Sequence, residues 1–247
     1  MAKPVFYPVS FLEASTIMVD GAAEGFPADA LGDRDVEQLW KDSEGGARQI
    51  TAQWTDADPP AVDTWILPAG HGLVGAPLTL ESSGDGAAWT ARDSVTPTSA
   101  ATLARTLAVP VTAAWWRLTM TTAAAAYLAE LYLTAAVPLP WAPSIGSLSD
   151  GLVGDVTRVV TPGGVVRKSR HWGLRWRASW TIADIDVPDW DRITAAIYPV
   201  LEGRFCYVRD HDGVLRWVEL LEPQWLADAA AVSRRNLRLE LQEVAPA

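Results

Sequence analysis

Histidine and cysteine are the residues of this chain that could support nucleophilic or metal chemistry. The 247-residue sequence has three histidines, His71, His171 and His211, which lie in separate turn or strand-edge sequences, and one cysteine, Cys206. A zinc site built on histidine would need the three to converge from both halves of the chain. A catalytic Cys206 would need a histidine base beside it; the alternative is a buried, inert thiol. The sequence favours neither chemistry.

Paired carboxylates could instead support hydrolysis of a sugar polymer. Such pairs occur at Asp56/Asp58 and Asp184/Asp186. A glycosidase needs two carboxyl groups at a defined separation across a cleft, and closeness in sequence does not supply it. The sequence also has no Gly-rich phosphate loop, no Gly-x-Ser-x-Gly elbow and no His-Glu-x-x-His helix. We therefore predict a protein that is not an enzyme and that carries no cofactor and no metal.

Tryptophan is over-represented, with 13 Trp against 4 Phe. An indole combines a large apolar surface with an N–H that needs a partner, which suits ligand contacts and interfaces. Exposed indoles could stack on the apolar face of a pyranose, with core packing as the alternative for each. The candidates for sugar binding are Trp40, Trp54, Trp65 and Trp89.

One stretch, His171–Ile182, alternates strictly between two kinds of residue. This alternation predicts a β-strand with a tryptophan face and an arginine face. The side chains of Trp172, Trp176 and Trp180 supply more apolar surface than a two-stranded ribbon can cover. The strand should therefore lie in a packed sandwich or against another subunit. The residues predicted to carry self-association are Trp172, Arg175, Trp176, Arg177 and Trp180.

The charge is negative and unevenly distributed. The net charge is −10; residues 1–136 hold 7 basic and 16 acidic residues, whereas residues 137–247 hold 13 and 14. An acidic chain whose one basic patch is Arg158–Arg177 argues against nucleic-acid binding. No segment is long and apolar enough to span a bilayer, and the first residues lack the apolar core of a signal peptide. We expect no membrane insertion.

Turn residues and prolines divide the chain. Pro138, Pro140 and Pro143 predict a linker over 137–147, between one domain at 1–136 and a second at 148–247. Short apolar runs between turns predict an antiparallel sandwich in the first domain. These runs are Gln49–Trp54, Thr64–Leu67, Leu78–Ser82, Trp115–Thr119 and Tyr127–Leu133. Ser83–Gly86 supplies a hairpin turn, after which Trp89 lies near the start of the return strand.

The second domain has hairpin signals and one helix. Pro162-Gly163-Gly164 predicts a turn, and Asp189 is expected to cap a helix that ends at Pro199, with a buried stripe. The stripe consists of Trp190, Ile193 and Ile197, and His211 is expected at a hairpin tip. The strands expected in this domain are Val156–Thr161, Val165–Arg167, Phe205–Arg209, Val214–Leu221 and Asn236–Leu241. The predicted class is all-β with one short helix: a jelly-roll β-sandwich followed by a second antiparallel β-sandwich or split barrel.

The order of elements in the first domain resembles the discoidin, or coagulation-factor C-domain, jelly roll. The resemblance rests on Pro27–Asp33 before Trp40, on the strands named above, on Trp116-Arg117-Leu118 and on Leu128–Leu133, and it covers about residues 12–135. Many carbohydrate-binding modules use this fold. The resemblance also implies a structural calcium near Leu31-Gly32-Asp33 and Glu130, although the family's Asp-Gly order is inverted here.

The second domain resembles tail-tip and distal-tail modules of tailed bacteriophages. The resemblance rests on the hairpin, the Arg/Trp strand, a helix ending before Gly203-Arg204-Phe205, and the turn at Asp210–Gly213. It implies a structural protein of the virion tail or baseplate that forms a ring with other copies and binds other tail proteins, with the jelly roll at the periphery. The alternative from another class is a carbohydrate-binding module that attaches to a cell-surface polysaccharide.

Overall fold

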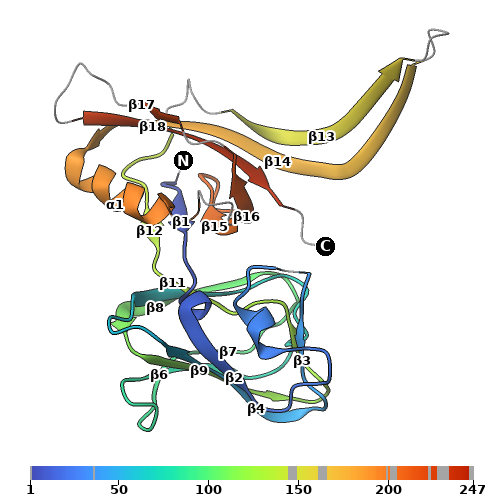
Figure 1. The fold of residues 1–247 in the computed structure, drawn as a ribbon, viewed down its shortest axis with the longest axis vertical. Coiled ribbons are helices and arrows are strands. Elements are labelled where there is room, and N and C mark those ends of the chain that lie inside the picture. The colour runs from blue at the N-terminus through green and yellow to red at the C-terminus, as the bar shows by residue number, and fades with distance from the viewer. Residues whose placement is uncertain are drawn as a thin grey trace. The chain divides into compact units, whose positions relative to one another are not determined.

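The computed structural model describes residues 2–35, 37–143, 149–160, 166–198, 200, 205–221, 224–226 and 234–244; for 154–160, 166–174 and 224–226 it describes the backbone alone. The chain divides into two compact units (Figure 1). The N-terminal unit is residues 7–137, and the C-terminal unit combines residues 2–6 with the described part of 138–244. Strands dominate both units, which confirms the all-β class, and the described residues include one α-helix.

A five-stranded antiparallel sheet, in the order β2-β4-β9-β6-β7, forms one layer of the N-terminal unit. Its strands are β2 Ser15–Val19, β4 Gly46–Trp54, β9 Trp115–Thr122, β6 Leu78–Ser83 and β7 Thr90–Val95. Three of the predicted apolar runs lie in β4, β6 and β9 and are confirmed as strands. They could be predicted because each alternates between buried and exposed residues.

A three-stranded antiparallel sheet, β11-β5-β8, forms a second layer. Strands β10 and β3 form a separate two-stranded sheet. The bounds are β11 Tyr132–Thr134, β5 Ala61–Leu67, β8 Leu103–Thr112, β10 Tyr127–Leu128 and β3 Trp40–Lys41, with 3-10 helices η1 Phe11–Ala14 and η2 Ala28–Leu31. The single strand predicted at Tyr127–Leu133 is two strands, because β10 pairs with β3 whereas β11 pairs with β5.

The core of the N-terminal unit lies between these sheets. Trp40, Trp65 and Trp116 are at most 1% exposed and pack in one cluster of apolar side chains. The Trp65 Nε1–H donates to Asp93 Oδ2 at 2.9 Å, and Arg105 donates two hydrogen bonds of 2.9 Å to the same carboxylate. Since Asp93 lies on β7, Trp65 on β5 and Arg105 on β8, this carboxylate joins the two sheets.

The C-terminal unit is built on one sheet in the order β12-β1-β15-β16-β18-β14-β13, with β17 also paired to β18. Its strands are β12 Val137–Pro138, β1 Val5–Tyr7, β15 Phe205–Arg209, β16 Leu215–Leu220, β18 Arg234–Glu243, β14 Val166–Asp186, β13 Ser149–Val160 and β17 Gln224–Leu226. The alternating stretch His171–Ile182 and the predicted strands Phe205–Arg209 and Asn236–Leu241 are confirmed within β14, β15 and β18.

Strand β14 is paired differently along its length. From Arg177 to Asp186 it pairs with β18, whereas from Val166 to Trp176 its described partner is β13 alone. Figure 1 shows β13 and β14 running on together as a curved two-stranded extension. The extension presents Leu152 and Val153 of β13 to solvent, at 64% and 50% exposed.

The helix, α1 Val187–Ile197, has the predicted buried residues Ile193 and Ile197, both 0% exposed. Its N-cap is Asp186, whose side chain accepts from the Asp189 N–H at 3.0 Å, so the prediction of Asp189 as the cap is corrected. Pro188 explains the shift, because proline fits the first turn of a helix and the cap must precede it. The helix has 11 residues, and the described residues contain no helix long and apolar enough to cross a bilayer.

Some predicted features fall where the chain is not described. The turn at Pro162-Gly163-Gly164, the helix end at Pro199 and the sequence around Gly203 lie outside the described residues. Within the range predicted as a linker, β12 pairs in the C-terminal sheet, Leu139 is 1% exposed, and the Trp141 Nε1–H donates to the carbonyl of Ala183 at 2.7 Å. From Pro138 onward, the described part of this range therefore belongs to the C-terminal unit.

Candidate functional site

The face of the five-stranded sheet that points away from the core is polar; we call it the outer face. On β9, Trp116, Leu118 and Met120 are buried, whereas the alternate residues Arg117 and Thr119 are partly exposed. The register places Thr51 of β4 and Glu81 of β6 on either side of Arg117, and Gln49 and Thr79 on either side of Thr119. Directly opposed residues share one face of a sheet. These six side chains therefore form one surface.

An indole lies over the middle of the outer face. The Arg117 guanidinium carbon is 4.1 Å from the centroid of the Trp89 ring, and Arg117 Nε donates to Glu81 Oε2 at 2.7 Å. The guanidinium is thus held between a carboxylate and the negative face of an aromatic ring. Trp89 remains partly exposed. The arrangement presents an indole, a cation and an anion within one small area.

The loop before Trp89 is fixed by one aspartate. Asp85 Oδ1 accepts hydrogen bonds from the N–H groups of Ala87 and Ala88 and from the Ser83 hydroxyl, at 2.9 to 3.0 Å. The bonds from Ala88 and Ala87 lower the pKa of Asp85 to about 2, so the carboxylate stays charged and the loop keeps its shape at neutral pH. A hairpin connection follows β6 as expected, with Gly86 at a positive φ of 76°, but its loop extends to Trp89, because the return strand β7 begins at Thr90.

A shallow hollow of about 360 Å³ continues the outer face beyond the Arg117–Glu81 pair. Its lining includes the polar residues Gln49, Thr79, Thr119 and Thr121, of which the Thr119 hydroxyl also donates to the Thr79 carbonyl at 3.3 Å. Thr119 is two residues from Arg117 on β9, and Thr79 is two residues from Glu81 on β6, a spacing of roughly 7 Å along each strand. The hollow and the indole therefore adjoin, and the hollow offers both hydrogen-bond donors and acceptors.

The four tryptophans predicted to bind sugar have different environments. Trp40 and Trp65 are 0% exposed, which corrects their assignment as stacking residues, because neither ring has a face open to a ligand. Trp54 is half-buried at the end of β4, with its ring 5.1 Å from that of Phe11. Trp89 alone of the four lies on the outer face. The sequence analysis did not predict Arg117, Glu81 or the threonines of the outer face as binding residues. The alternation of polar residues along β9 was a signal for them.

Two of the five predicted interface residues lie inside the C-terminal unit. Trp176 and Trp180 are 4% and 0% exposed, with ring centroids 6.0 Å apart, which corrects their assignment to contacts between chains: these are core residues, the other alternative that the sequence left open. Arg175 is partly buried, and exposed Arg177 pairs with Glu240 at 3.1 Å. The side chain of Trp172 lies outside the described residues.

Glu130, one ligand of the calcium that the jelly-roll resemblance implies, is a buried carboxylate. Glu130 is 0% exposed, and neither carboxylate oxygen has a hydrogen-bond partner in the described part of the chain. Desolvation raises the pKa of Glu130 to about 8, and the positive charge near it comes from Arg34, which is itself 7% exposed and paired with Glu13. Calcium needs six or more oxygen ligands. Glu130 is the one unpartnered carboxylate in the described part of this region, so a calcium here is only what the resemblance implies.

The groups considered for catalysis are dispersed. Cys206 is fully buried in β15, and His71 is 2% exposed in the other unit, where burial lowers its pKa. The side chain of His171 is not described. Asp56 and Asp58 are exposed residues of one loop. Only His211 approaches other metal-ligating groups in the described residues.

No family model and no curated protein matches the chain. Solved structures with a similar fold include a family 32 carbohydrate-binding module of Clostridium perfringens in complex with GalNAc-β-1,3-galactose, at 14% identity and a TM-score of 0.44, covering 53% of this chain and 99% of that one. A chitosan-binding module of a Paenibacillus chitosanase/glucanase has 19% identity and a TM-score of 0.45, covering 51% and 98%. At these identities and TM-scores, the likeness assigns no ligand to this chain.

Proposed function

We propose that the N-terminal unit binds carbohydrate on its outer face. The observation that carries the proposal is Trp89, a partly exposed indole held over the Arg117–Glu81 pair beside a hollow lined with hydroxyl and amide groups. Sugars present apolar C–H faces that pack on indoles and rims of hydroxyls that need donors and acceptors together. The outer face offers both kinds of contact.

The charge of this unit restricts the class of ligand. Residues 1–136 have a net charge of −9, so a polyanion such as nucleic acid would be repelled. A neutral or weakly charged oligosaccharide fits the surface better. One sugar ring would contact the exposed part of Trp89, and the next would lie over Thr79 and Thr119, with Arg117 and Glu81 positioned to bond hydroxyls between them.

Calorimetric titration of the full chain against glycans chosen from an array tests this proposal. Trp89→Ala should weaken binding by about 2 kcal/mol, or about 30-fold, the loss expected of an aromatic hot spot. Trp141→Ala is the matched control, because Trp141 is 42% exposed and belongs to the C-terminal unit. Equal glycan affinity of Trp89→Ala and the parent, or no binding of the parent to any glycan, would contradict the proposal.

A second candidate function is assembly into a bacteriophage tail tip or baseplate, as the sequence resemblance implies. The observation that favours assembly is the long β13–β14 extension with exposed Leu152 and Val153, since an edge strand with apolar side chains can pair with another chain. In this proposal the extension and Arg177, in place of the buried tryptophans, meet the neighbouring subunit. Native mass spectrometry of the parent and of a Leu152→Lys/Val153→Lys variant tests it; a monomeric parent alone and with tail proteins contradicts it.

A further inference from the structure

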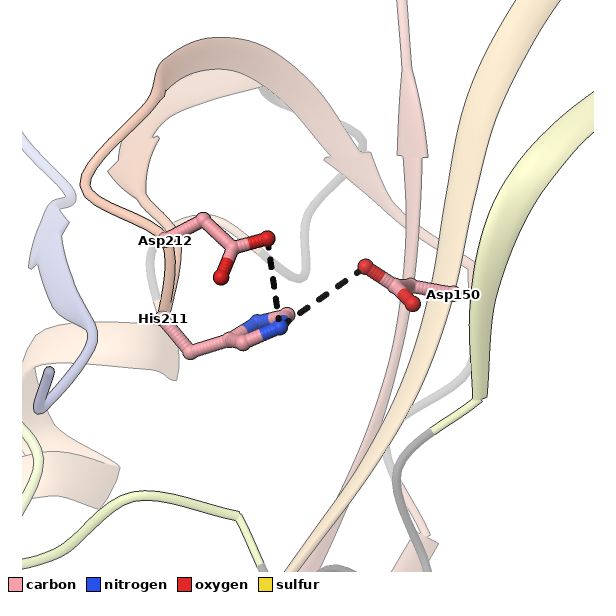
Figure 2. A group of neighbouring side chains, drawn as sticks. All are labelled: Asp150, His211 and Asp212. Carbon is pink, nitrogen blue, oxygen red and sulfur yellow. Dashed lines mark ion pairs between the residues drawn. The ribbon is translucent and has the colours of Figure 1, made fainter. Parts of the chain in front are cut away.

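Three side chains of the C-terminal unit converge on one point (Figure 2). They are Asp150 of β13, and His211 and Asp212 of the turn between β15 and β16. The His211 Nε2 lies 3.6 Å from Asp212 Oδ2 and 3.8 Å from Asp150 Oδ2. One ligand atom from each residue lies within 4.8 Å of the other two. The proposed sugar-binding face belongs to the other unit and does not use them.

The imidazole of His211 is buried, and one of its two ring nitrogens has no hydrogen-bond partner among the described residues. His211 is 5% exposed, and its Nδ1 has no partner among the described residues. Its Nε2 points at the two carboxylates, but 3.6 and 3.8 Å exceed the reach of a hydrogen bond. A buried imidazole is normally satisfied through its ring nitrogens. Nε2 is thus the imidazole atom that faces both carboxylates, at separations that an ion bound to all three groups would bridge.

The backbone holds the three side chains in place. Asp150 is opposite Ala178 in the register, and Ala178 is 2% exposed, so Asp150 projects from the buried face of the sheet. The same face carries Trp180, whose ring meets the His211 ring edge-on at 6.3 Å and 87°. Asp210 fixes the turn, because its Oδ1 accepts from the N–H groups of Asp212 and Val214 at 2.9 and 2.8 Å.

The charges of the cluster are not balanced by the protein. Neither Asp150 nor Asp212 forms an ion pair with an arginine or lysine in the described part of the chain; each has His211 as its partner. The two carboxylates bring a formal charge of −2 to the cluster. A divalent cation would neutralise that charge and provide the His211 nitrogen with a bond.

We infer that Asp150, His211 and Asp212 bind a divalent transition-metal ion, with zinc as the best match. Zinc binds imidazole nitrogen at about 2.0–2.1 Å and carboxylate oxygen at about 2.0–2.2 Å, which in a tetrahedral site separates the ligand atoms by roughly 3.4 Å. The observed separations from Nε2 need to close by only a few tenths of an ångström. Calcium and magnesium prefer oxygen ligands alone, and the imidazole therefore favours zinc.

The ion would join parts of the sheet that are not neighbours. Strands β18 and β14 lie between β16 and the edge strand β13 in the strand order. A metal bound to Asp150 and to the His211–Asp212 turn would therefore fasten the start of β13 across the sheet. With three protein ligands, water completes the coordination.

Calorimetric titration of the chelator-treated full chain with zinc chloride tests the inference. We expect one zinc ion per chain, bound with micromolar or tighter affinity, and a Tm that rises with zinc concentration. Asp212→Asn should weaken zinc binding at least about tenfold, as the loss of a ligand requires. Asp212 is 68% exposed on its side chain, so this variant should fold. Asp191→Asn, an exposed aspartate on α1, is the matched control and should bind zinc like the parent.

Asp150→Asn and His211→Gln extend the test, and each should also weaken zinc binding. Circular dichroism checks that they fold; if His211→Gln does not, the two aspartate variants still decide the matter. The assignment is overturned by an absence of saturable zinc binding, by unchanged affinity in both aspartate variants, or by calcium binding tighter than zinc.

Discussion

Strands β9 and β14 show how the same sequence pattern can serve different ends. Both alternate between tryptophan-containing buried faces and arginine-containing outer faces, and both pair an outer arginine with a glutamate on a neighbouring strand. Arg117 is 22% exposed because Trp89 covers it, whereas Arg177 is 46% exposed. The difference comes from a loop: Asp85 fixes the segment that carries Trp89 over the sheet. A strand pattern thus predicts a face, and a loop decides what the face can bind.

The largest effect on stability should come from replacing the buried tryptophan found in each of the two units. Trp116→Ala and Trp180→Ala each remove a fully buried indole and should cost about 3–5 kcal/mol of unfolding free energy. Because the chain forms two compact units, each variant should lower one calorimetric transition and leave the other in place. A loss of both transitions in either variant would show that the units fold as one.

Glu130 should give the N-terminal unit its own pH dependence. Its folded pKa, about 8, is above the ordinary 4.5 because burial disfavours the charged form. Its contribution to stability is therefore fully present below pH 4.5 and lost as pH rises through about 8. Thermal melts of the parent and Glu130→Gln across this range test it: the difference between the two Tm curves should widen in favour of the variant. A constant difference would contradict the raised pKa.

Replacing the two arginines tests the comparison of β9 with β14 directly. Arg117→Ala should weaken glycan binding by at least about 1.4 kcal/mol, or tenfold, because the residue both holds Trp89 and can bond sugar hydroxyls. Arg177→Ala should leave glycan affinity unchanged. Titration against the best glycan measures both; equal effects of the two substitutions would refute the distinction.

The smallest effect should be that of Arg177→Ala on stability. The Arg177–Glu240 pair is exposed, at 46% and 27% for the two side chains, and pairs of this kind contribute about 0.2–1 kcal/mol. Urea unfolding at low and high salt should show a loss within that range that shrinks as salt rises. A loss above about 2 kcal/mol would mean that Arg177 has a buried partner.

The strands could be predicted from the sequence where their residues alternate. Where their side chains are described, β4, β6, β9, β14 and β18 alternate buried with less buried residues over part of their length, and that period is visible in a single sequence. The helix was located from a different period, the four-residue spacing of Ile193 and Ile197 on one helix face, although Pro188 places its cap at Asp186. The division at Tyr127–Leu133 was missed, because the change of partner from β3 to β5 is a property of the sheet and not of the residues themselves.

The candidate sites depend on contacts between distant segments. Nothing in the sequence around Trp40 and Trp89 separates a core indole from a surface one, because their burial depends on which strand and loop pack beside them. The Asp150–His211 approach follows from the register of β13 against β14 and the position of the β15–β16 turn. The sequence argument against a metal site required several histidines, whereas the structure brings one histidine to two aspartates.

Asp93 makes the contact between the two sheets of the N-terminal unit sensitive to acid. This one carboxylate accepts from Trp65 and Arg105 and so links β7, at the edge of the five-stranded layer, to β5 and β8 of the opposite layer. The hydrogen bond from Arg105 lowers the pKa of Asp93, so the link is fully charged above the ordinary pKa of 3.8 and weakens as pH falls through the lowered folded value. In strong acid the contact of β7 with β5 and β8 should therefore weaken first, while the buried Trp65 side chain still packs between the two sheets.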